Sequence, residues 1–172
     1  MNSFEITKIG VEQLVPLQKI GRTTFLHTFS STDTEENMDV YLDHAFSAEK
    51  LTAELENPNS EFYFATQNEV VIGYLKVNFG PAQTEIQHQN TLEIERIYVL
   101  QEFHGKKVGQ LLFEKALAIA KQKKVDFIWL GVWEENHRAL QFYSKNGFVA
   151  FDKHIFVFGD EAQTDIMMKL VL

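Results

Sequence analysis

The sequence predicts an α/β (α+β) fold, in which a mixed, mostly antiparallel central sheet is flanked by helices. Three observations support this prediction. The hydrophobic spacing is helical over much of residues 7–57, it changes to a period of two over residues 61–79, and two later strand patterns each lead into a helical pattern. The chain has 172 residues, 45% of them hydrophobic, so we expect a single domain spanning residues 1–172.

The first third of the chain is predicted to contain one strand and three helices. "FEITKI" (residues 4–9) alternates and indicates a short strand. A helix is expected within residues 7–29, and a second one over about residues 34–45, where Thr34 can act as the N-cap. A third helix is predicted to begin at Ser47 and to end before Pro58.

The middle of the chain is predicted to be mostly strands. "EFYFATQ" (61–67) and "EVVIGYLKVNF" (69–79) are separated by a polar turn, which predicts an antiparallel hairpin. "LEIERIYV" (92–99) is a third strand, followed by a glycine-containing loop and a helix. "DFIWLGVW" (126–133) is almost wholly apolar, so both of its faces are expected to be covered.

The last part of the chain is predicted to hold a helix and two strands. The helix spans about residues 136–145, and the strands are "FVAFDKHIFVF" (148–158) and "DIMMKLVL" (165–172). Between them lies "GDEAQT" (159–164), whose turn-forming residues predict a hairpin connection.

Composition excludes several classes of function. The chain has no cysteine, which excludes disulfides, thiolate metal sites and a cysteine nucleophile, and its six histidines show no metal-ligand spacing, so no metal site is expected. No apolar run approaches the roughly 18 residues that cross a bilayer. We therefore expect a cytoplasmic protein without membrane contact, and the net charge of −8 argues against binding to nucleic acid.

The excess negative charge lies in the N-terminal half. Residues 1–90 carry 5 Lys/Arg and 13 Asp/Glu, whereas residues 91–172 carry 11 of each. The acidic residues are densest in "TDTEENMDVYLDHAF", which contains Asp33, Glu35, Glu36, Asp39 and Asp43. This stretch is either a solvated helix face or an electrostatic attractor for a cationic ligand.

The loop after residues 92–99 holds Gly105, Lys106, Lys107 and Gly109 where a strand passes into a helix. Such a loop either makes a tight turn or presents unpaired N–H groups and lysine charges to an anion, and a diphosphate fits the second alternative. It matches neither a P-loop nor the three-glycine dinucleotide fingerprint.

"IYVLQEFHGKKVGQLLFEKAL" (97–117) and "ENHRALQFYSKNGF" (135–148) together resemble the GNAT superfamily of acetyl-CoA-dependent N-acetyltransferases. The second segment matches through Asn136, Ala139, Phe142, Tyr143, Gly147 and Phe148. In the first segment His104 stands where Gln or Arg is usual and Lys107 where the first motif glycine is usual. Within the superfamily the chain is most similar to the PaiA-type spermine/spermidine acetyltransferases.

This resemblance implies a GNAT-like fold and acetyl-CoA (CoA) as the cofactor. The residues it places against CoA are Ile97, Tyr98, Val99, His104, Gly105, Lys106, Lys107, Val108, Gly109, Asn136 and Tyr143. Residues 97–99 would offer backbone groups to the pantetheine arm, and Asn136 would also cap the helix that follows it. The non-glycine residue Lys107 is expected to be tolerated because it would already lie in the first turn of the helix.

The resemblance also implies catalytic roles. Tyr143 would be the general acid that protonates the departing thiolate, although on composition alone it is a core aromatic. Glu95 is the favoured base and Glu93 the second choice, while the alternative for either is a solvated or salt-bridged residue near Arg96. Glu93 and Glu95 alternate along a strand, so both would face one side unless a bulge intervenes.

The function implied is transfer of an acetyl group to a primary amine of a small cationic acceptor, a polyamine such as spermidine or spermine, in a ternary complex. The alternatives are acetylation of a protein N-terminus or lysine, and a CoA-binding regulatory module without turnover. Asp160, Glu161 or Asp165 in "GDEAQTD" contributes to the amine site or belongs only to a turn. A homodimer is expected by analogy alone.

Overall fold

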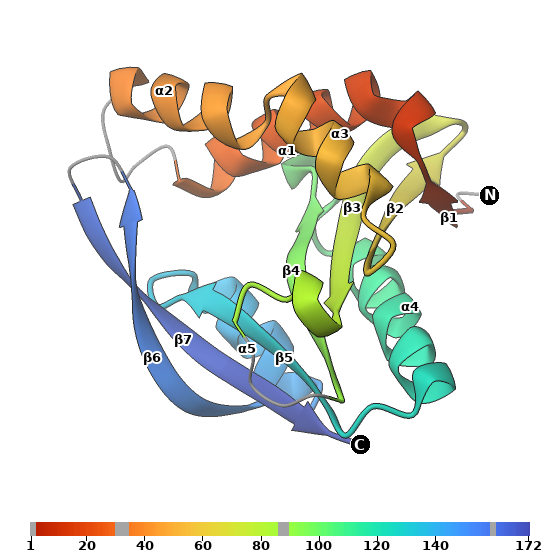
Figure 1. The fold of residues 1–172 in the computed structure, drawn as a ribbon, viewed down its shortest axis with the longest axis vertical. Helices are drawn as coiled ribbons and strands as arrows, with labels where there is room; N and C mark the ends of the chain where they lie inside the picture. The colour runs from red at the N-terminus through yellow and green to blue at the C-terminus, as the bar shows by residue number, and fades with distance from the viewer. Residues whose placement is uncertain (1–2, 30–34, 86–89, 159–160) are drawn as a thin grey trace.

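The computed structural model describes residues 3–29, 35–85, 90–158 and 161–172. Within them the chain forms a seven-stranded sheet with the strand order β1-β2-β3-β4-β5-β7-β6 (Figure 1). The strands are β1 (Glu5–Ile9), β2 (Ser60–Gln67), β3 (Val70–Phe79), β4 (Thr91–Val99), β5 (Phe127–Trp133), β6 (Val149–Phe158) and β7 (Glu161–Val171). Every neighbouring pair is antiparallel except β4 and β5. The predicted mixed, mostly antiparallel sheet is confirmed.

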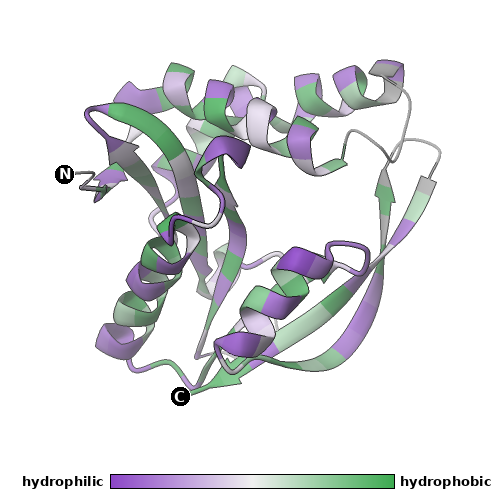
Figure 2. Cartoon of the chain, turned by 180° about the vertical axis from the view of Figure 1, so that it is seen from behind, coloured by the Kyte–Doolittle hydropathy of each residue, from purple (hydrophilic) through white to green (hydrophobic). Residues whose placement is uncertain are grey.

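Helices cover both faces of the sheet. The helices α1 (Leu14–Phe29), α2 (Glu35–Ala45) and α3 (Ala48–Glu56) pack with β2 and β3 around one hydrophobic cluster. The helices α4 (Val108–Lys123) and α5 (His137–Lys145) pack on a second cluster from the other side. Figure 2 shows apolar and polar residues alternating along these helices, as expected when one side of each is buried. In the described part of the chain, no helix is long and apolar enough to span a membrane.

Local sequence signals explain several element ends. The Ser47 side chain accepts a hydrogen bond from the Lys50 N–H at 3.1 Å and caps α3 as predicted. The β2–β3 hairpin turns at Asn68 and Glu69, which both have positive φ, as a tight turn of this kind requires. The N-cap expected at Thr34 lies outside the described residues.

Strands β4 and β5 part from each other, and this parting shapes the molecule. They pair only over Thr91–Glu93 and Phe127–Trp129, after which they diverge (Figure 1). On its other edge β4 stays paired with β3 to its end. The register changes between Lys76 and Val77, so that Glu95 is the extra residue of a β-bulge.

The bulge reverses which β4 side chains face which helices. Before it, Leu92 and Ile94 pack in the cluster with α4, and after it Ile97 and Val99 do so. Tyr98 packs on the opposite side, with α1 to α3. Simple alternation from Glu93 through Val99 is therefore broken at Glu95, as allowed for in the sequence analysis.

Two predictions about strands need correction. The "GDEAQT" connection is mostly strand, because β7 begins at Glu161 and residues 162–164 pair with residues 155–157 of β6. Its polar residues signalled a turn, but in a ribbon that projects beyond β5 they are strand residues. The Gly159–Asp160 part of this prediction lies outside the described residues, and the Glu161 side chain is not described. Strand β5 is covered on both faces over Ile128–Leu130, as expected, but not at Gly131, which is exposed beside the gap between β4 and β5.

Candidate active site

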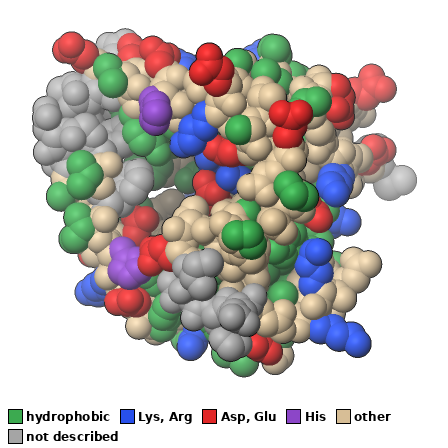
Figure 3. All heavy atoms as spheres, viewed as in Figure 1, with side chains coloured by type: hydrophobic (Ala, Val, Ile, Leu, Met, Phe, Trp, Pro, Cys, Tyr) green, Lys and Arg blue, Asp and Glu red, His purple; other side chains and the backbone are tan. Residues whose placement is uncertain are grey.

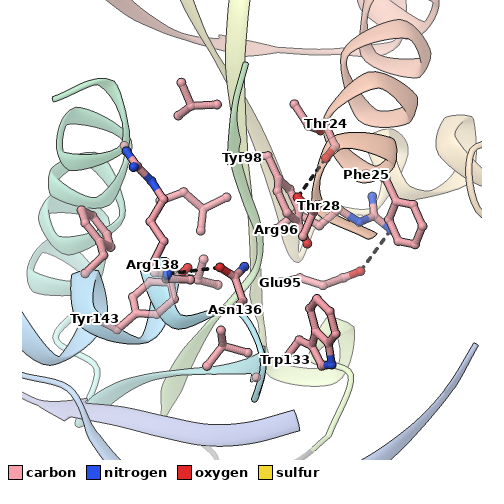
Figure 4. A pocket seen from close by; sticks show the side chains of 18 of the residues that line it. Thr24, Phe25, Thr28, Glu95, Arg96, Tyr98, Trp133, Asn136, Arg138 and Tyr143 are labelled. Carbon is pink, nitrogen blue, oxygen red and sulfur yellow. Dashed lines mark hydrogen bonds and ion pairs between the residues drawn. The ribbon is translucent and has the colours of Figure 1, made fainter. Parts of the chain in front are cut away.

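A cleft of about 1840 Å³ lies where β4 and β5 part. Figure 3 looks onto the face where it opens, and shows a hollow with acidic and basic side chains beside each other on its wall. One end is bounded by the start of α4 and by α5, and the other by α1, α2 and β7. The strand gap therefore connects two sites of different character (Figure 4).

The end of the cleft near α4 is suited to bind an anion. Val108, Gly109 and Gln110 open the helix, where no preceding turn can accept hydrogen bonds from their N–H groups. The first helical bond runs from Leu111 N to Lys107 O at 3.1 Å. Gly105 and residues 107–110 all line the cleft, so the helix dipole and these N–H groups lie at its wall.

The conformation of Lys107 corrects one expectation. Lys107 is the N-cap of α4 and adopts the left-handed region, with φ 67° and ψ 17°, instead of a helical conformation. Left-handed backbone costs a residue with a Cβ roughly 1–2 kcal/mol. The position at which the resemblance implies a glycine thus has a glycine-like conformation in this chain, and the lysine is under strain.

Two other loop residues are engaged locally. A ring nitrogen of His104, Nε2, lies 2.9 Å from the Val99 carbonyl oxygen, so the ring ties the loop back to the end of β4. Lys106 does not line the cleft, and its ammonium lies 5.3 Å from the centre of the Phe103 ring. His104 lines the cleft and Lys107 does too, so of the loop residues expected to contact CoA only Lys106 lies outside it.

Residues Ile97, Tyr98 and Val99 lie on the β4 edge that β5 has left, and all three line the cleft. An unpaired strand edge offers backbone N–H and C=O groups to an extended ligand. The amide-containing arm of CoA fits such an edge, and its phosphates fit the start of α4. The described residues are therefore compatible with bound CoA.

Tyr143 lies between the core and the cleft. Its ring packs against Phe142 and Phe148 at centroid distances of 5.4 and 5.5 Å, and only 7% of the residue is exposed. It lines the cleft nevertheless, and in the described part of the chain its hydroxyl has no hydrogen-bond partner. Burial raises the pKa of Tyr143, so the hydroxyl stays protonated and can donate a hydrogen bond.

Asn136 caps α5, as predicted. Its side-chain oxygen accepts a hydrogen bond from Ala139 N at 3.2 Å (Figure 4). It also lines the cleft beside Arg138 and Lys145, two cations that the sequence analysis did not single out. No signal distinguished them from other surface cations, because only the fold brings α5 beside the start of α4.

Glu95 is held in a dense ionic network. Its carboxylate lies 2.6 Å from Lys76 Nζ and 3.1 Å from Arg96 NH2, and it accepts from Asn78 at 2.9 Å. Lys76 and Arg96 are both also bound to Glu54, at 3.0 and 2.9 Å. Lys50 also lies 4.0 Å from Glu54, so two carboxylates face three cations.

The network makes Glu95 a weak base. Burial alone would raise the pKa of Glu95, but the charges of Arg96 and Lys76 and the hydrogen bonds outweigh burial and lower this pKa to about 2. Glu95 is therefore salt-bridged near Arg96, which was the alternative to a catalytic base. This geometry argues against direct proton transfer to Glu95.

Glu93 is even more enclosed, with 3% of the residue exposed. It accepts hydrogen bonds from Asn78, from the Thr84 N–H and from the Thr84 hydroxyl. Burial raises the pKa of Glu93, although these hydrogen bonds oppose the shift. Its oxygens already hold the loop after β3 against β4.

The opposite end of the cleft is aromatic. Phe25 stacks on Tyr41 with a centroid distance of 4.9 Å, and Phe29 lies 5.3 Å from Trp133, so α1, α2 and β5 build one wall. Asp165 of β7 lies at this end. Arg96 and Tyr98 also line the cleft. Sequence reasoning did not assign the aromatic residues of α1, α2 and β5 to the site, because they converge from distant parts of the chain.

The acidic stretch of α2 is not part of the cleft wall. Glu36, Asp39 and Asp43 are exposed, and Asp43 pairs with Arg22 at 3.2 Å. Among the described residues of this stretch, only Tyr41, Ala45 and Phe46 line the cleft. Asp33 lies outside the described residues, and the Glu35 side chain is not described.

Replacing Lys107 with glycine is expected to raise the free energy of unfolding by about 0.5–1 kcal/mol, because the strain is relieved at some cost in chain entropy. Urea unfolding measures the change. Lys107→Ala is the control, since it removes the charge but keeps the Cβ, and Lys124→Gly should give a similar gain because Lys124 also has positive φ. Equal stability of the glycine and alanine variants at position 107 would contradict the strain.

Glu95→Gln is expected to destabilise the protein by about 1–3 kcal/mol near neutral pH, because Lys76 and Arg96 lose a charged partner. A folded-state pKa of about 2 lies below the ordinary value of 4.5, so the contribution is complete above pH 4.5 and disappears as the pH falls toward 2.

Urea unfolding of wild type and variant across this pH range measures the difference, with the exposed Glu114→Gln as the control. A difference between wild type and Glu95→Gln that stays constant with pH would refute the ionic role.

Comparison with known proteins assigns the family. Residues 23–148 match the model of the Acetyltransferase (GNAT) family. An uncharacterized N-acetyltransferase in the pepI 3′ region of Lactobacillus delbrueckii subsp. lactis is 37% identical over 172 residues, covering 100% of this chain and 99% of that protein. The spermidine N(1)-acetyltransferase of Thermoplasma acidophilum is 29% identical over 154 residues, covering 87% of this chain and 91% of that protein.

A solved structure extends the likeness to the whole fold. The PaiA N-acetyltransferase of Thermoplasma acidophilum, crystallised in complex with coenzyme A, superposes with a TM-score of 0.82 at 26% identity, covering 99% of each chain. The family match, the Lactobacillus relative matched over its whole length and this superposition agree with one another. The chain belongs to the GNAT family and is an acetyl-CoA-dependent N-acetyltransferase.

Proposed function

We propose that this enzyme acetylates a primary amine of a small cationic acceptor, a polyamine such as spermidine or spermine, by direct transfer in a ternary complex. The observation that carries the proposal is the continuous cleft through the strand gap. Because one cleft reaches both the α4 helix start and the aromatic end, acetyl-CoA and the amine can approach each other from opposite ends.

The acceptor class is supported by two features. The aromatic end, with Phe25, Tyr41 and Trp133, offers ring faces to a cation and to its methylene chain. In addition, a relative at 29% identity is named a spermidine N(1)-acetyltransferase. The acidic face of α2 lies outside the cleft, so its only contribution is a long-range field that favours cations.

The CoA contacts remain part of this proposal. The backbone of Ile97–Val99 and the helix start from Gly105 to Gly109 would hold the pantetheine arm and the diphosphate, with Lys107 as the loop lysine that lines the cleft. Asn136 lies beside this path at the start of α5.

During transfer the amine nitrogen bonds to the acetyl carbon, the carbon–sulfur bond breaks, the sulfur gains one proton and the ammonium loses two. We assign the proton for sulfur to the Tyr143 hydroxyl, which is protonated and without a partner in the described structure. The first ammonium proton leaves through water in the cleft, since Glu95 and Glu93 are both held by other groups. The second is lost as the amide forms and returns through water to the Tyr143 oxygen, so that one proton is released in total.

Thiol release from acetyl-CoA tests the proposal. The acceptor panel contains spermidine, spermine, a peptide amine and no acceptor, and the proteins are wild type, Tyr143→Phe and Tyr63→Phe. Polyamines should sustain turnover, and Tyr143→Phe should lower kcat by roughly 100-fold or more, because a general acid is lost. Tyr63 is a buried tyrosine outside the cleft wall, so its variant should retain the wild-type rate.

Thermal shift with CoA serves as the binding control, and both variants should bind CoA as the wild type does. Turnover with the peptide amine but with neither polyamine would contradict the acceptor class. An unchanged kcat in Tyr143→Phe would instead contradict the role of the tyrosine.

A further inference from the structure

Six acidic side chains among the described residues line the cleft: Glu85, Glu93, Glu95, Glu114, Glu135 and Asp165. The first five each have a polar partner, namely His154, Thr84 and Asn78, Lys76 and Arg96, Gln110, and His137. Within the described part of the chain, Asp165 alone of the six makes no hydrogen bond or ion pair. An uncompensated carboxylate at a half-buried position is costly unless a ligand supplies the missing charge.

The histidine paired with Asp165 across the sheet is already engaged. His154, its partner on β6, has one ring nitrogen 2.7 Å from Glu85 and the other 3.0 Å from Asp152. Burial raises the pKa of Asp165, and His154 only partly opposes this shift. The carboxylate is therefore left facing the cleft without a compensating charge.

The surroundings of Asp165 are open on the side of the cleft. Its partner on β5 is Trp133, and Gly131 lies beside it without a side chain. A Cβ at Gly131 would lie 3.5 Å from Asp165 Oδ2 and 3.3 Å from Met167 Sδ, so the glycine keeps the carboxylate accessible. Two residues along the same face of β7, Gln163 is 8% exposed and its buried Oε1 also lacks a hydrogen-bond partner. Donors are thus missing at two successive positions of this strand face.

Asp165 lies away from Tyr143, the residue to which we assign protonation of the sulfur. The neighbouring residues Ile166 and Met168 pack in the cluster that contains Tyr143, whereas Asp165 points to the other face of β7. It also lies one strand beyond β5, and adjacent strands are about 4.8 Å apart. A linker of three or four carbons between two amines spans a comparable distance.

We propose that Asp165 is the specificity residue that binds the second ammonium group of a diamine or polyamine acceptor, the one that is not acetylated. The ammonium lies against Asp165 beside the Trp133 ring, while the first amine reaches the strand gap. This inference rests on the proposed function, because it names the residue that would distinguish polyamines from simple amines.

The test compares spermidine with n-butylamine, which has a primary amine but no second ammonium. In Asp165→Asn the KM for spermidine should rise roughly 10- to 100-fold, because a charged hydrogen bond is lost. The kcat for spermidine and both constants for n-butylamine should be unchanged. The isosteric Glu135→Gln is the matched control, since Glu135 is an exposed carboxylate of the same cleft and should leave the KM for spermidine unchanged.

CoA-induced thermal stabilisation of Asp165→Asn should equal that of the wild type, which separates a lost contact from a damaged fold. Equal losses for both amines, or a fall in kcat, would overturn the inference because Asp165 would then act at the reacting amine or on the structure. An unchanged KM for spermidine would overturn it as well. If the wild type turns over neither amine, the proposed function itself fails, and Asp165 has no second ammonium group to bind.

Discussion

Strand β4 is paired with β3 from Leu92 to Val99, apart from the bulge at Glu95, but with β5 over only three residue pairs, and the site depends on this parting. A sheet that stayed closed would have no free edge at Ile97–Val99 and no passage between its two faces. Strand β5 stays paired with β7 over Phe127–Trp133, so the second half of the sheet remains continuous while it diverges from β4. The helices complete the cleft, but the strand gap connects its ends.

The gap is bordered by a charged network that keeps β4 bulged. Glu54 of α3 and Glu95 of β4 bind the same two cations, Lys76 and Arg96, so the helix and both strands are tied at one point. This network has a consequence for chemistry, because the Glu95 carboxylate is already held by Lys76 and Arg96. The amine proton must then leave through water, and the charge of the acceptor must be met by another group, for which we propose Asp165.

Local signals in the sequence predicted most elements, because capping residues, turns and hydrophobic periods act over a few residues. Ser47 and Asn136 cap the helices as expected. Three features were not predicted. Lys107 is not a glycine, so its left-handed conformation had no signal; Glu95 pairs with Lys76, which is distant in the sequence; and residues 162–164 are polar, so they signalled a turn although they are strand. The candidate CoA residues could be named from the motifs, whereas the aromatic end required the fold to bring α1, α2 and β5 together.

Amide hydrogen exchange with and without CoA tests most directly whether the strand gap holds the cofactor. Binding should slow exchange at the cleft-facing amides of Ile97–Val99 and at the amides of Gly105–Gln110, because these groups lie on the free strand edge and at the open helix start. Exchange in α2 should not change. Protection confined to residues outside the gap, with none at Gly105–Gln110, would contradict the account.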